Sequence, residues 1–207
     1  RPTVKSMVFA NGREVGYDGV ISSIPLPDLI PLIEGAPADV MQAAHKLACT
    51  GCVLVNVGVA RAGISDAHIS YFYDPDIVFT RLSFPHKMSP HNAPHGGSSI
   101  QAEIYFSEKY KPLKKNPEQL IDAVLENLIR CGLLTADDRI LCKHTMILNY
   151  ANVIFDLDRA PALDVVHGYL DDIGVAYCGR YGDWGYMWTD ESFKSGERAA
   201  VTILETL

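Results

Sequence analysis

The segment 178–200, CGRYGDWGYMWTDESFKSGERAA, contains the densest group of residues able to bind a ligand. Its glycines, Gly179, Gly182 and Gly185, let the backbone approach a flat or phosphorylated ligand closely. A helix is predicted from Thr189 onward, and its first N–H groups and positive dipole end favour electron-rich oxygens. The same pattern fits a tight strand-to-helix connection with aromatic side chains in the core, because glycine-rich turns are common in loops without a ligand. The residues alone leave both interpretations open.

A cation and an anion are predicted on two strands in the middle of the chain. Side chains alternate along a strand, so Arg81 lies on one face of the strand expected at 78–84, and Glu103 on one face of that expected at 100–106. If these faces meet a cavity, Arg81 is placed to bind a substrate phosphate or carboxylate in a bidentate manner. Arg81 and Glu103 could equally form an inter-strand ion pair. The sequence leaves both alternatives open.

Other reactive residue types favour ordinary structural roles. His86, His91 and His95 share one loop at spacings that no metal framework demands, so they are interpreted as solvated histidines and no metal site is expected. Cys49 and Cys52 form a single C-x-x-C without a second pair, which is typical of buried cysteines.

Composition narrows the class of ligand. The 207 residues carry 18 basic and 25 acidic side chains, a net charge of -7, which argues against a nucleic-acid or acidic-membrane surface. A small molecule, neutral or held by a few local cations, is the expected substrate. Five cysteines are an odd, sparse set, which favours a reducing, cytoplasmic location over a disulfide framework. No stretch has the apolar length of a membrane span.

The elements that must position these residues follow an α+β pattern. We predict a mixed or antiparallel sheet of five or more strands packed by about four helices. The strand expected at 20–24 is apolar enough to be buried. Strands are predicted at 4–10, 14–17, 20–24, 52–60, 69–73, 78–84, 100–106, 140–150 and 175–178, and helices at 38–48, 117–131, 158–173 and from 189 onward.

Local signals mark three connections. Asn11-Gly12 predicts a tight hairpin turn. Asn116, followed by a proline and by Gln119, predicts a capped helix start. The long loop 85–99 is of a kind that is often functional or mobile.

The stretch GRYGDWGYMWTDESFKSGERAA resembles the C-terminal flavin motif of the FAD-dependent amine-oxidase superfamily, and is most similar to its UDP-galactopyranose-mutase-like and protoporphyrinogen-oxidase-like branches. The resemblance implies FAD as cofactor. It implies that Gly179 and Arg180 contact the flavin or its ribityl and phosphate region, and that Trp184, Gly185 and Tyr186 line the flavin edge.

Earlier segments resemble the same family in the same order. YDGVISSIPLPDLIPLI is similar to the family's return strand, and FTRLSFPHKMSP with QAEIYF resembles the strand pair that carries an Arg and a Glu near the active site. The resemblance implies a catalytic and substrate-binding role for Arg81 and a substrate-binding role for Glu103.

One family element is missing from the sequence. The FAD fold of the family begins with a strand, G-x-G-x-x-G and a helix, and no such βαβ pattern occurs here. We therefore expect a partial fold, the C-terminal half of a longer flavoprotein whose N-terminal FAD-binding half is its partner. In this interpretation residues 1–35 return toward the cofactor domain, 36–174 form the substrate side, and 175–207 cap the flavin.

Three functions remain open at this point. The first is a FAD-dependent oxidoreductase of the amine-oxidase superfamily, inactive as a fragment. The second is a flavin-dependent nucleotide-sugar mutase in polysaccharide biosynthesis, an isomerase of the UDP-galactopyranose mutase type. The third is a non-catalytic interaction domain that retains part of a flavoenzyme scaffold.

Overall fold

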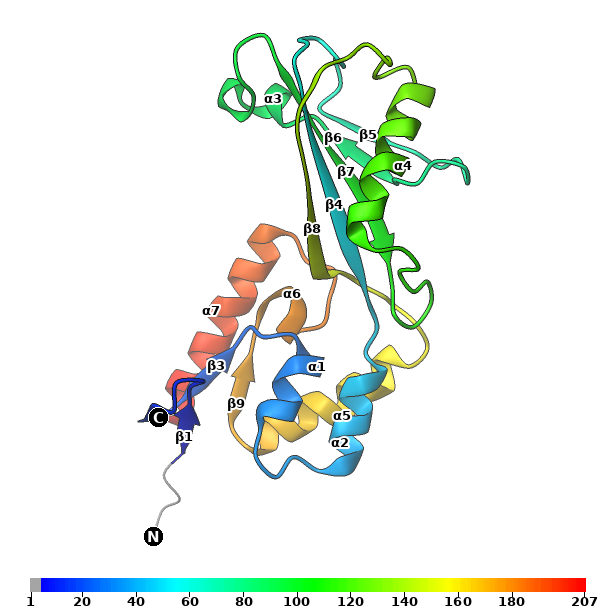
Figure 1. Cartoon of the computed structure of the whole chain (residues 1–207). Coiled ribbons are helices and arrows are strands. Elements are labelled where there is room, and N and C mark those ends of the chain that lie inside the picture. The colour runs from blue at the N-terminus through cyan, green and yellow to red at the C-terminus, as the bar shows by residue number, and fades with distance from the viewer. Residues whose placement is uncertain (1–4) are drawn as a thin grey trace. The chain divides into compact units, whose positions relative to one another are not determined.

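The computed structural model describes residues 5–207, and the chain divides into two compact units (Figure 1). The sheet unit is Cys49–Asn152, and the terminal unit combines the residues up to Ala48 with Val153–Leu207. The division by role at residues 35 and 174 stays a prediction, because compactness does not report which residues contact a ligand.

The sheet unit contains five strands in the order β5-β6-β7-β4-β8. The pairs β5/β6, β6/β7 and β7/β4 are antiparallel. Two short helical turns, α3 and η2, lie within the long loop predicted at 85–99. The elements are β4 (Cys49–Val59), β5 (Ile69–Tyr71), β6 (Arg81–Ser83), α3 (Pro85–Met88), η2 (Pro90–Asn92), β7 (Ser98–Phe106), α4 (Pro117–Arg130) and β8 (Ile140–Val153).

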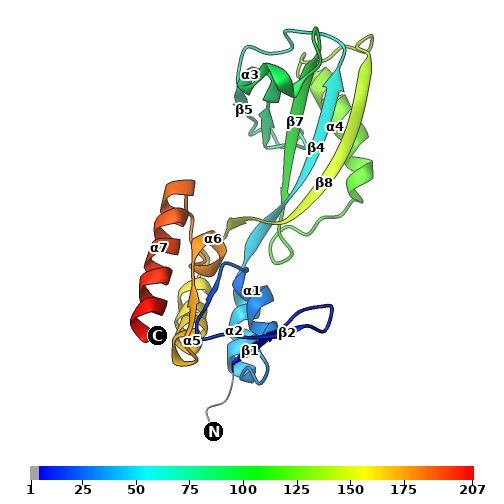
Figure 2. The same ribbon diagram turned by 90° about the vertical axis from the view of Figure 1, so that its left-hand side faces the viewer.

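Alternating side chains give this sheet one apolar and one polar face. On β4, Val53 and Val55 are buried, whereas Leu54 and Asn56 between and beyond them are partly exposed. Helix α4 lies along the sheet (Figure 2) and its apolar residues join the apolar face in one core. That core includes Val53, Val55, Val57, Leu82, Phe84, Ile100, Ala102, Ile104, Leu120, Val124 and Leu128. The opposite, polar face of the sheet carries Arg81 and Glu103 among its side chains.

Helix α4 begins and ends as its sequence predicts. The Asn116 side chain accepts from the Glu118 N–H at 3.1 Å, and the Gln119 side chain accepts from the Asn116 N–H at 3.3 Å. Gly132, with φ of +72°, follows the last turn, where a left-handed residue favours glycine.

The terminal unit combines two small sheets with helices. Strands β3 and β9 pair in parallel with Val20 opposite Val175, while α2 packs against α5. The elements are β1 (Ser6–Val8), β2 (Glu14–Gly16), β3 (Val20–Ser22), α1 (Leu26–Leu29), η1 (Ile30–Leu32), α2 (Ala38–Lys46), α5 (Arg159–Asp172), β9 (Val175–Tyr177), α6 (Gly179–Gly182) and α7 (Thr189–Thr206).

The predicted N-terminal hairpin is present as the antiparallel pair β1 and β2. Gly12 has a φ of +79°, as the tight turn requires. Residue 4, where the first strand was expected to begin, lies outside the described residues.

The α+β class is confirmed by these elements. The large sheet is antiparallel, and the described residues contain four helices of nine or more residues, namely α2, α4, α5 and α7.

Strand β3 departs from the sequence prediction. The run 20–24 was expected to be a buried strand, but β3 ends at Ser22 and Ile21 is 41% exposed. The cause is the size of its sheet, since within residues 5–207 β3 has β9 alone as a partner. Parallel sheets are normally larger and covered on both faces, so this two-stranded piece leaves apolar surface open.

Helix α7 also buries a different face from the expected one. The helical spacing of Phe193, Ala200 and Leu204 predicts that these apolar residues share one packed side. In the structure Phe193 and Leu204 are 70% and 71% exposed, whereas Ser195 and Ala199 are buried. Ser195 is bound through its hydroxyl, so a polar position replaces an apolar one in the packed stripe. Among residues 5–207, no helix combines the length and apolarity that a membrane crossing needs.

Candidate functional site

Arg81, Glu103 and Tyr105 form a hydrogen-bonded cluster, here called the Arg81 cluster, on the polar face of the sheet unit. Arg81 on β6 lies directly opposite Glu103 on β7, so their side chains share one face. Arg81 Nη2 donates to Glu103 Oε1, and Tyr105 Oη donates to Glu103 Oε2 at 2.5 Å. Glu103 is only 4% exposed, and these donors offset the desolvation of its charge. The inter-strand ion pair is therefore formed.

The ion pair leaves part of Arg81 accessible. The Arg81 side chain is 33% exposed, against 5% for that of Glu103. A guanidinium carries five N–H donors, and one bond to Glu103 does not use them all. Structural pairing and substrate binding are thus compatible, and the substrate-binding role of Arg81 and Glu103 stays a prediction.

Burial governs the protonation of two neighbours of Glu103. It raises the pKa of Tyr105, with the Glu103 carboxylate acting in the same direction, so the phenol remains a donor near neutral pH. Cys52 lies opposite Tyr105 on β4, and burial, reinforced by Glu103, raises the pKa of its thiol to about 12. The Tyr105 phenol and the Cys52 thiol are therefore both protonated at neutral pH.

The Cys52 environment yields a first prediction. At about pH 8 we expect Cys52 to react with a thiol reagent roughly 10³-fold more slowly than an ordinary cysteine, since the thiolate is the reactive form. Cys142, which is exposed, serves as the internal control. Labelling under native conditions followed by peptide mass spectrometry measures both rates, and equal rates would contradict the buried, high-pKa thiol.

The second group of predicted site residues lies in the terminal unit, in the 178–188 turn. Gly179 has a φ of +75° and its N–H donates to Ser195 Oγ at 2.9 Å. The Ser195 hydroxyl in turn donates to Asp183 Oδ2 at 2.5 Å, which ties the turn to α7. The glycine is needed here because other residues rarely adopt this conformation.

Arg180 and Gly185 play different parts in this turn. Arg180 donates from Nε and Nη2 to the Met187 carbonyl at 3.1 and 2.6 Å, and its guanidinium lies 5.2 Å from the Tyr186 ring centre. Gly185 faces space: a Cβ built there meets Met187 alone, at 3.7 Å. Tyr186 is 55% exposed, so the outer rim of the turn is accessible. The roles predicted for Gly179, Arg180, Trp184, Gly185 and Tyr186 at a flavin stay predictions.

The start of α7 is less suited to an anion than its sequence suggested. The helix begins at Thr189, as predicted, but the N–H of Trp188 already donates to Glu191 Oε2 at 2.8 Å. Asp190 and Glu191 place two carboxylates in the first turn, where they complement the helix dipole themselves. An incoming phosphate would meet this negative charge.

Two residues that hold the turn were not singled out from the sequence as site residues. Arg159 donates to the Trp184 carbonyl from Nε at 2.9 Å and from Nη2 at 2.6 Å. His167 Nε2 lies 2.9 Å from the Gly182 carbonyl while its ring stacks on Tyr177 at 4.1 Å. One sequence feature could have pointed to Arg159: it is a cation at the first position of α5, where the helix dipole disfavours positive charge.

The remaining reactive residues gather into no centre. Within residues 5–207, no group of three His, Cys, Asp or Glu side chains is arranged to hold a metal ion, and the five cysteines are free thiols. The His86 ring contacts the Ser99 backbone instead, with Nδ1 within 3.1 Å of its N–H and carbonyl.

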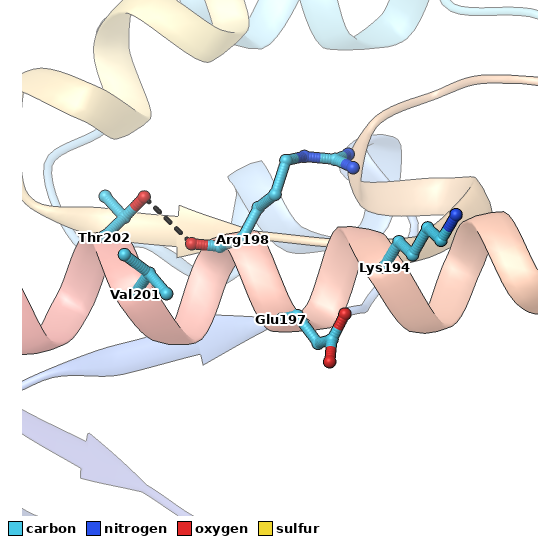
Figure 3. A pocket seen from close by; sticks show the side chains of 5 residues that line it. All are labelled: Lys194, Glu197, Arg198, Val201 and Thr202. Atoms are coloured by element: carbon cyan, nitrogen blue, oxygen red, sulfur yellow. Dashed lines mark hydrogen bonds between the residues drawn. The ribbon is translucent and has the colours of Figure 1, made fainter.

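A groove of about 640 Å³ lies along α7 (Figure 3). Its lining residues all belong to this one helix, which makes it an open surface and not an enclosed ligand site. A smaller cavity of about 230 Å³ lies between α5, β9, α7 and the residue that follows α6, and it is lined in part by Asp171, Tyr177 and Asp183. Neither contains the Arg81 cluster or Gly185. The groove residues are Lys194, Glu197, Arg198, Val201 and Thr202.

Comparison with known proteins identifies the fold. No protein-family model and no curated protein matches the chain. The chain is similar over 99% of its length to the crystal structure of reduced UDP-galactopyranose mutase, with a TM-score of 0.88 and 24% identity. It is also similar over 97% to a protoporphyrinogen oxidase-like protein from Exiguobacterium sp. 255-15 (TM-score 0.73, 16% identity) and over 97% to a Pyrococcus furiosus protein (0.59, 14%).

The chain spans 44% of each of these three solved structures. The likeness confirms the partial fold expected from the resemblance of the 178–200 segment and the earlier strands. At these levels of identity it reports on the fold, which leaves the reaction to be argued from the chain's own residues.

Proposed function

We propose that this chain is the substrate-side and flavin-capping part of a longer FAD-dependent oxidoreductase of the amine-oxidase superfamily. The observation that carries the proposal is the glycine turn at the carboxyl ends of β3 and β9. The Cys178 N–H donates to the Ser22 carbonyl at 2.9 Å, so the two parallel strands end side by side before Gly179. In open α/β sheets, ligands bind outside the carboxyl ends of parallel strands.

The residues of the turn fit one end of a FAD molecule. Gly179 has a left-handed backbone conformation, and Gly185 has no side chain to fill the space beside it. Tyr186 is exposed and lies beside the Arg180 guanidinium. The pyrophosphate end would need the G-x-G-x-x-G turn that the sequence lacks, and we assign that end to the N-terminal half of the longer protein. Additional parallel strands from that half would also cover the exposed Ile21.

In this proposal the flavin, when bound, supplies the redox chemistry, and the protein supplies orientation, electrostatics and exclusion of water. Gly179 and Arg180 hold the ribityl and phosphate region. Gly185, Tyr186 and the backbone of Trp184, whose indole is buried, line the flavin edge. Arg81 binds the substrate through the donors that Glu103 leaves free, and Glu103 fixes the guanidinium in place.

The charge of the Arg81 cluster supports an oxidoreductase acting on a small molecule. Glu103 neutralises Arg81, so the cluster offers one partly compensated cation. A single carboxylate or carbonyl group matches this charge better than a diphosphate, which is usually bound by several cations. The net charge of -7 likewise disfavours a diphosphate as the ligand.

A nucleotide-sugar mutase is the second candidate. It is supported by the TM-score of 0.88 with reduced UDP-galactopyranose mutase. A third interpretation is a non-catalytic interaction domain on the same scaffold, which fits the protonated state of Tyr105 and Cys52 at neutral pH.

One experiment separates the three. The gene segment upstream of Arg1 is expressed together with this chain, and the absorption spectrum of the purified protein is recorded. Its turnover is then assayed with amine and CH–CH substrates and, under reducing conditions, with UDP-galactopyranose. Oxidation of an amine or of a CH–CH bond supports the oxidoreductase, whereas conversion of UDP-galactopyranose only when the flavin is reduced supports the mutase. A protein that binds no flavin would contradict both and leave the interaction domain.

The proposal predicts weak FAD binding by the 207-residue chain alone. Because the pyrophosphate would have no helix N-terminus to bind, isothermal titration at about micromolar FAD should give little heat. Free riboflavin, which lacks the pyrophosphate, is the matched ligand and should bind about equally weakly. Stoichiometric yellow protein from this chain alone would contradict the assignment of the pyrophosphate site to another segment.

A further inference from the structure

We propose that Arg159 is a positioning residue that holds Trp184 in a left-handed backbone conformation and thereby fixes the outer rim of the 178–188 turn. The inference deepens the proposed function, on which it rests for the identity of the ligand. Arg159 belongs to α5, 25 residues before Trp184, and it contacts the turn without forming its rim.

Trp184 has an unusual conformation. Its φ is +47°, and it is the one non-glycine residue with a positive φ among residues 5–207. A bulky side chain is strained there, and such strain persists where the surroundings over-determine it. The indole is fully buried, which holds the side chain in place, while the backbone needs a separate restraint.

Arg159 supplies that restraint through the Trp184 carbonyl. Nε and Nη2 donate to this one oxygen at 2.9 and 2.6 Å. The guanidinium is itself held by the Phe155 ring, 4.2 Å from its Cζ. On the other side of the same peptide bond, the Gly185 N–H donates to the Arg180 carbonyl at 3.0 Å. The plane of the Trp184–Gly185 peptide is thus fixed from both edges.

The position of Arg159 in its own helix argues for a role outside that helix. It is the first residue of α5, where the helix dipole favours an acidic residue and disfavours a cation. Burial lowers the pKa of Arg159, so the site does not favour its charge either. The two bonds to the Trp184 carbonyl and the contact with the Phe155 ring compensate for this cost.

The peptide that Arg159 fixes is the one that places Gly185. Beyond it, Gly185 faces open space and Tyr186 is exposed. Rotation of this peptide would turn the Gly185 backbone and displace Tyr186, so Arg159 sets the rim that the proposed function places against the flavin edge.

The first test uses tryptophan fluorescence of the 207-residue chain. The chain has two tryptophans, and Trp188 is 68% exposed, so Trp188→Phe leaves the buried Trp184 as the reporter. In that background Arg159→Met keeps an unbranched chain over Phe155 but removes the donors. We expect a red-shifted emission and a several-fold rise in acrylamide quenching, with Arg159→Lys in between. Arg130→Met, which removes an exposed pair with Asp76, is the control.

The outcomes of this test are distinct. Unchanged Trp184 emission in Arg159→Met would overturn the proposal. Loss of helix by far-UV circular dichroism in both Arg159 variants would assign Arg159 to the scaffold and also overturn it.

The second test measures flavin affinity in the longer protein. Arg159→Met should weaken FAD binding at least tenfold, and Arg159→Lys should recover part of it. If Trp184 emission moves but FAD affinity does not, the positioning role at the cofactor is wrong while the proposed function stands. If the unmodified longer protein binds no flavin, the proposed function fails, and the fluorescence result still reports on the restraint of Trp184.

Discussion

Gly185→Val is expected to remove flavin from the longer protein while leaving the melting temperature of this chain almost unchanged. A Cβ at Gly185 meets the Met187 side chain alone, at 3.7 Å, which is ordinary van der Waals contact. Its φ is not in the left-handed region, so a branched residue is not strained by the backbone there. A surface change of this kind alters stability by about 0.5 kcal/mol or less.

Flavin is lost in Gly185→Val because the valine side chain would fill the open space beside residue 185. If the flavin edge lies against the Gly185 backbone, a valine side chain occupies its volume. Overpacking of a well-fitted contact costs about 1–3 kcal/mol. This corresponds to FAD binding roughly ten- to a hundredfold weaker. The flavin-to-protein ratio and the apo-protein melting temperature, measured on the same variant, report the two effects separately.

Gly182→Ala is the matched control for Gly185→Val. A Cβ at Gly182 lies 3.3 Å from the Ser22 carbonyl oxygen and 3.4 Å from Tyr177, so this variant should lose stability without a ligand. A Gly185→Val protein with full flavin and unchanged melting would remove the 178–188 turn from the proposed site.

Local sequence signals predicted the elements of this fold where neighbours in the chain decide the structure. The capping box of Asn116 and Gln119 forms as expected, because both partners lie within one helical turn. The Asn11-Gly12 hairpin is equally local. The exposure of Ile21 could not be predicted this way, since it depends on which strands complete the sheet.

The candidate site shows the same limit. Strand alternation placed Arg81 and Glu103 each on one face of its strand, but the register that makes them direct partners is set by the whole sheet. The bond of Arg159 to Trp184 joins residues 25 positions apart, and the positive φ of Trp184 has no local sequence signal. Contacts of this kind come from packing, which a single sequence does not record.

Arg81→Ala is expected to lower both the stability of this chain and the turnover of the longer protein. Glu103 is 4% exposed, and without Arg81 its carboxylate keeps Tyr105 as a donor but loses its charged partner. Leaving a buried charged group short of a partner costs more than the about 1–3 kcal/mol of a neutral polar group. Loss of charge-assisted bonds to the substrate should lower kcat/KM by roughly ten- to a hundredfold. Thermal melting and steady-state kinetics measure the two.

Arg61→Ala is the matched control in the same unit. Arg61 donates to Asp138 from Nε at 2.6 Å and from Nη2 at 2.9 Å, an ion pair apart from the Arg81 cluster. Asp138 is held well below its usual pKa, chiefly by this bond, so the variant should lose stability at neutral pH. A carboxyl group whose pKa is lowered by folding stabilises the folded protein at pH values above its pKa in the unfolded chain. The loss of stability in the variant should therefore shrink as pH falls below about 4. Turnover should be unchanged apart from the lower stability.

Arg81→Lys separates the structural part of Arg81 from its part at the substrate. A lysine retains a positive charge beside Glu103, so much of the melting temperature should return. Its ammonium is a point charge and cannot reproduce a bidentate fork, so kcat/KM should stay low. If Arg81→Lys restores both, charge alone matters at this position. If Arg81→Ala and Glu103→Ala lose equal stability and both keep normal turnover, Arg81 belongs to the scaffold, because a residue that binds substrate cannot be removed without a change in kcat/KM.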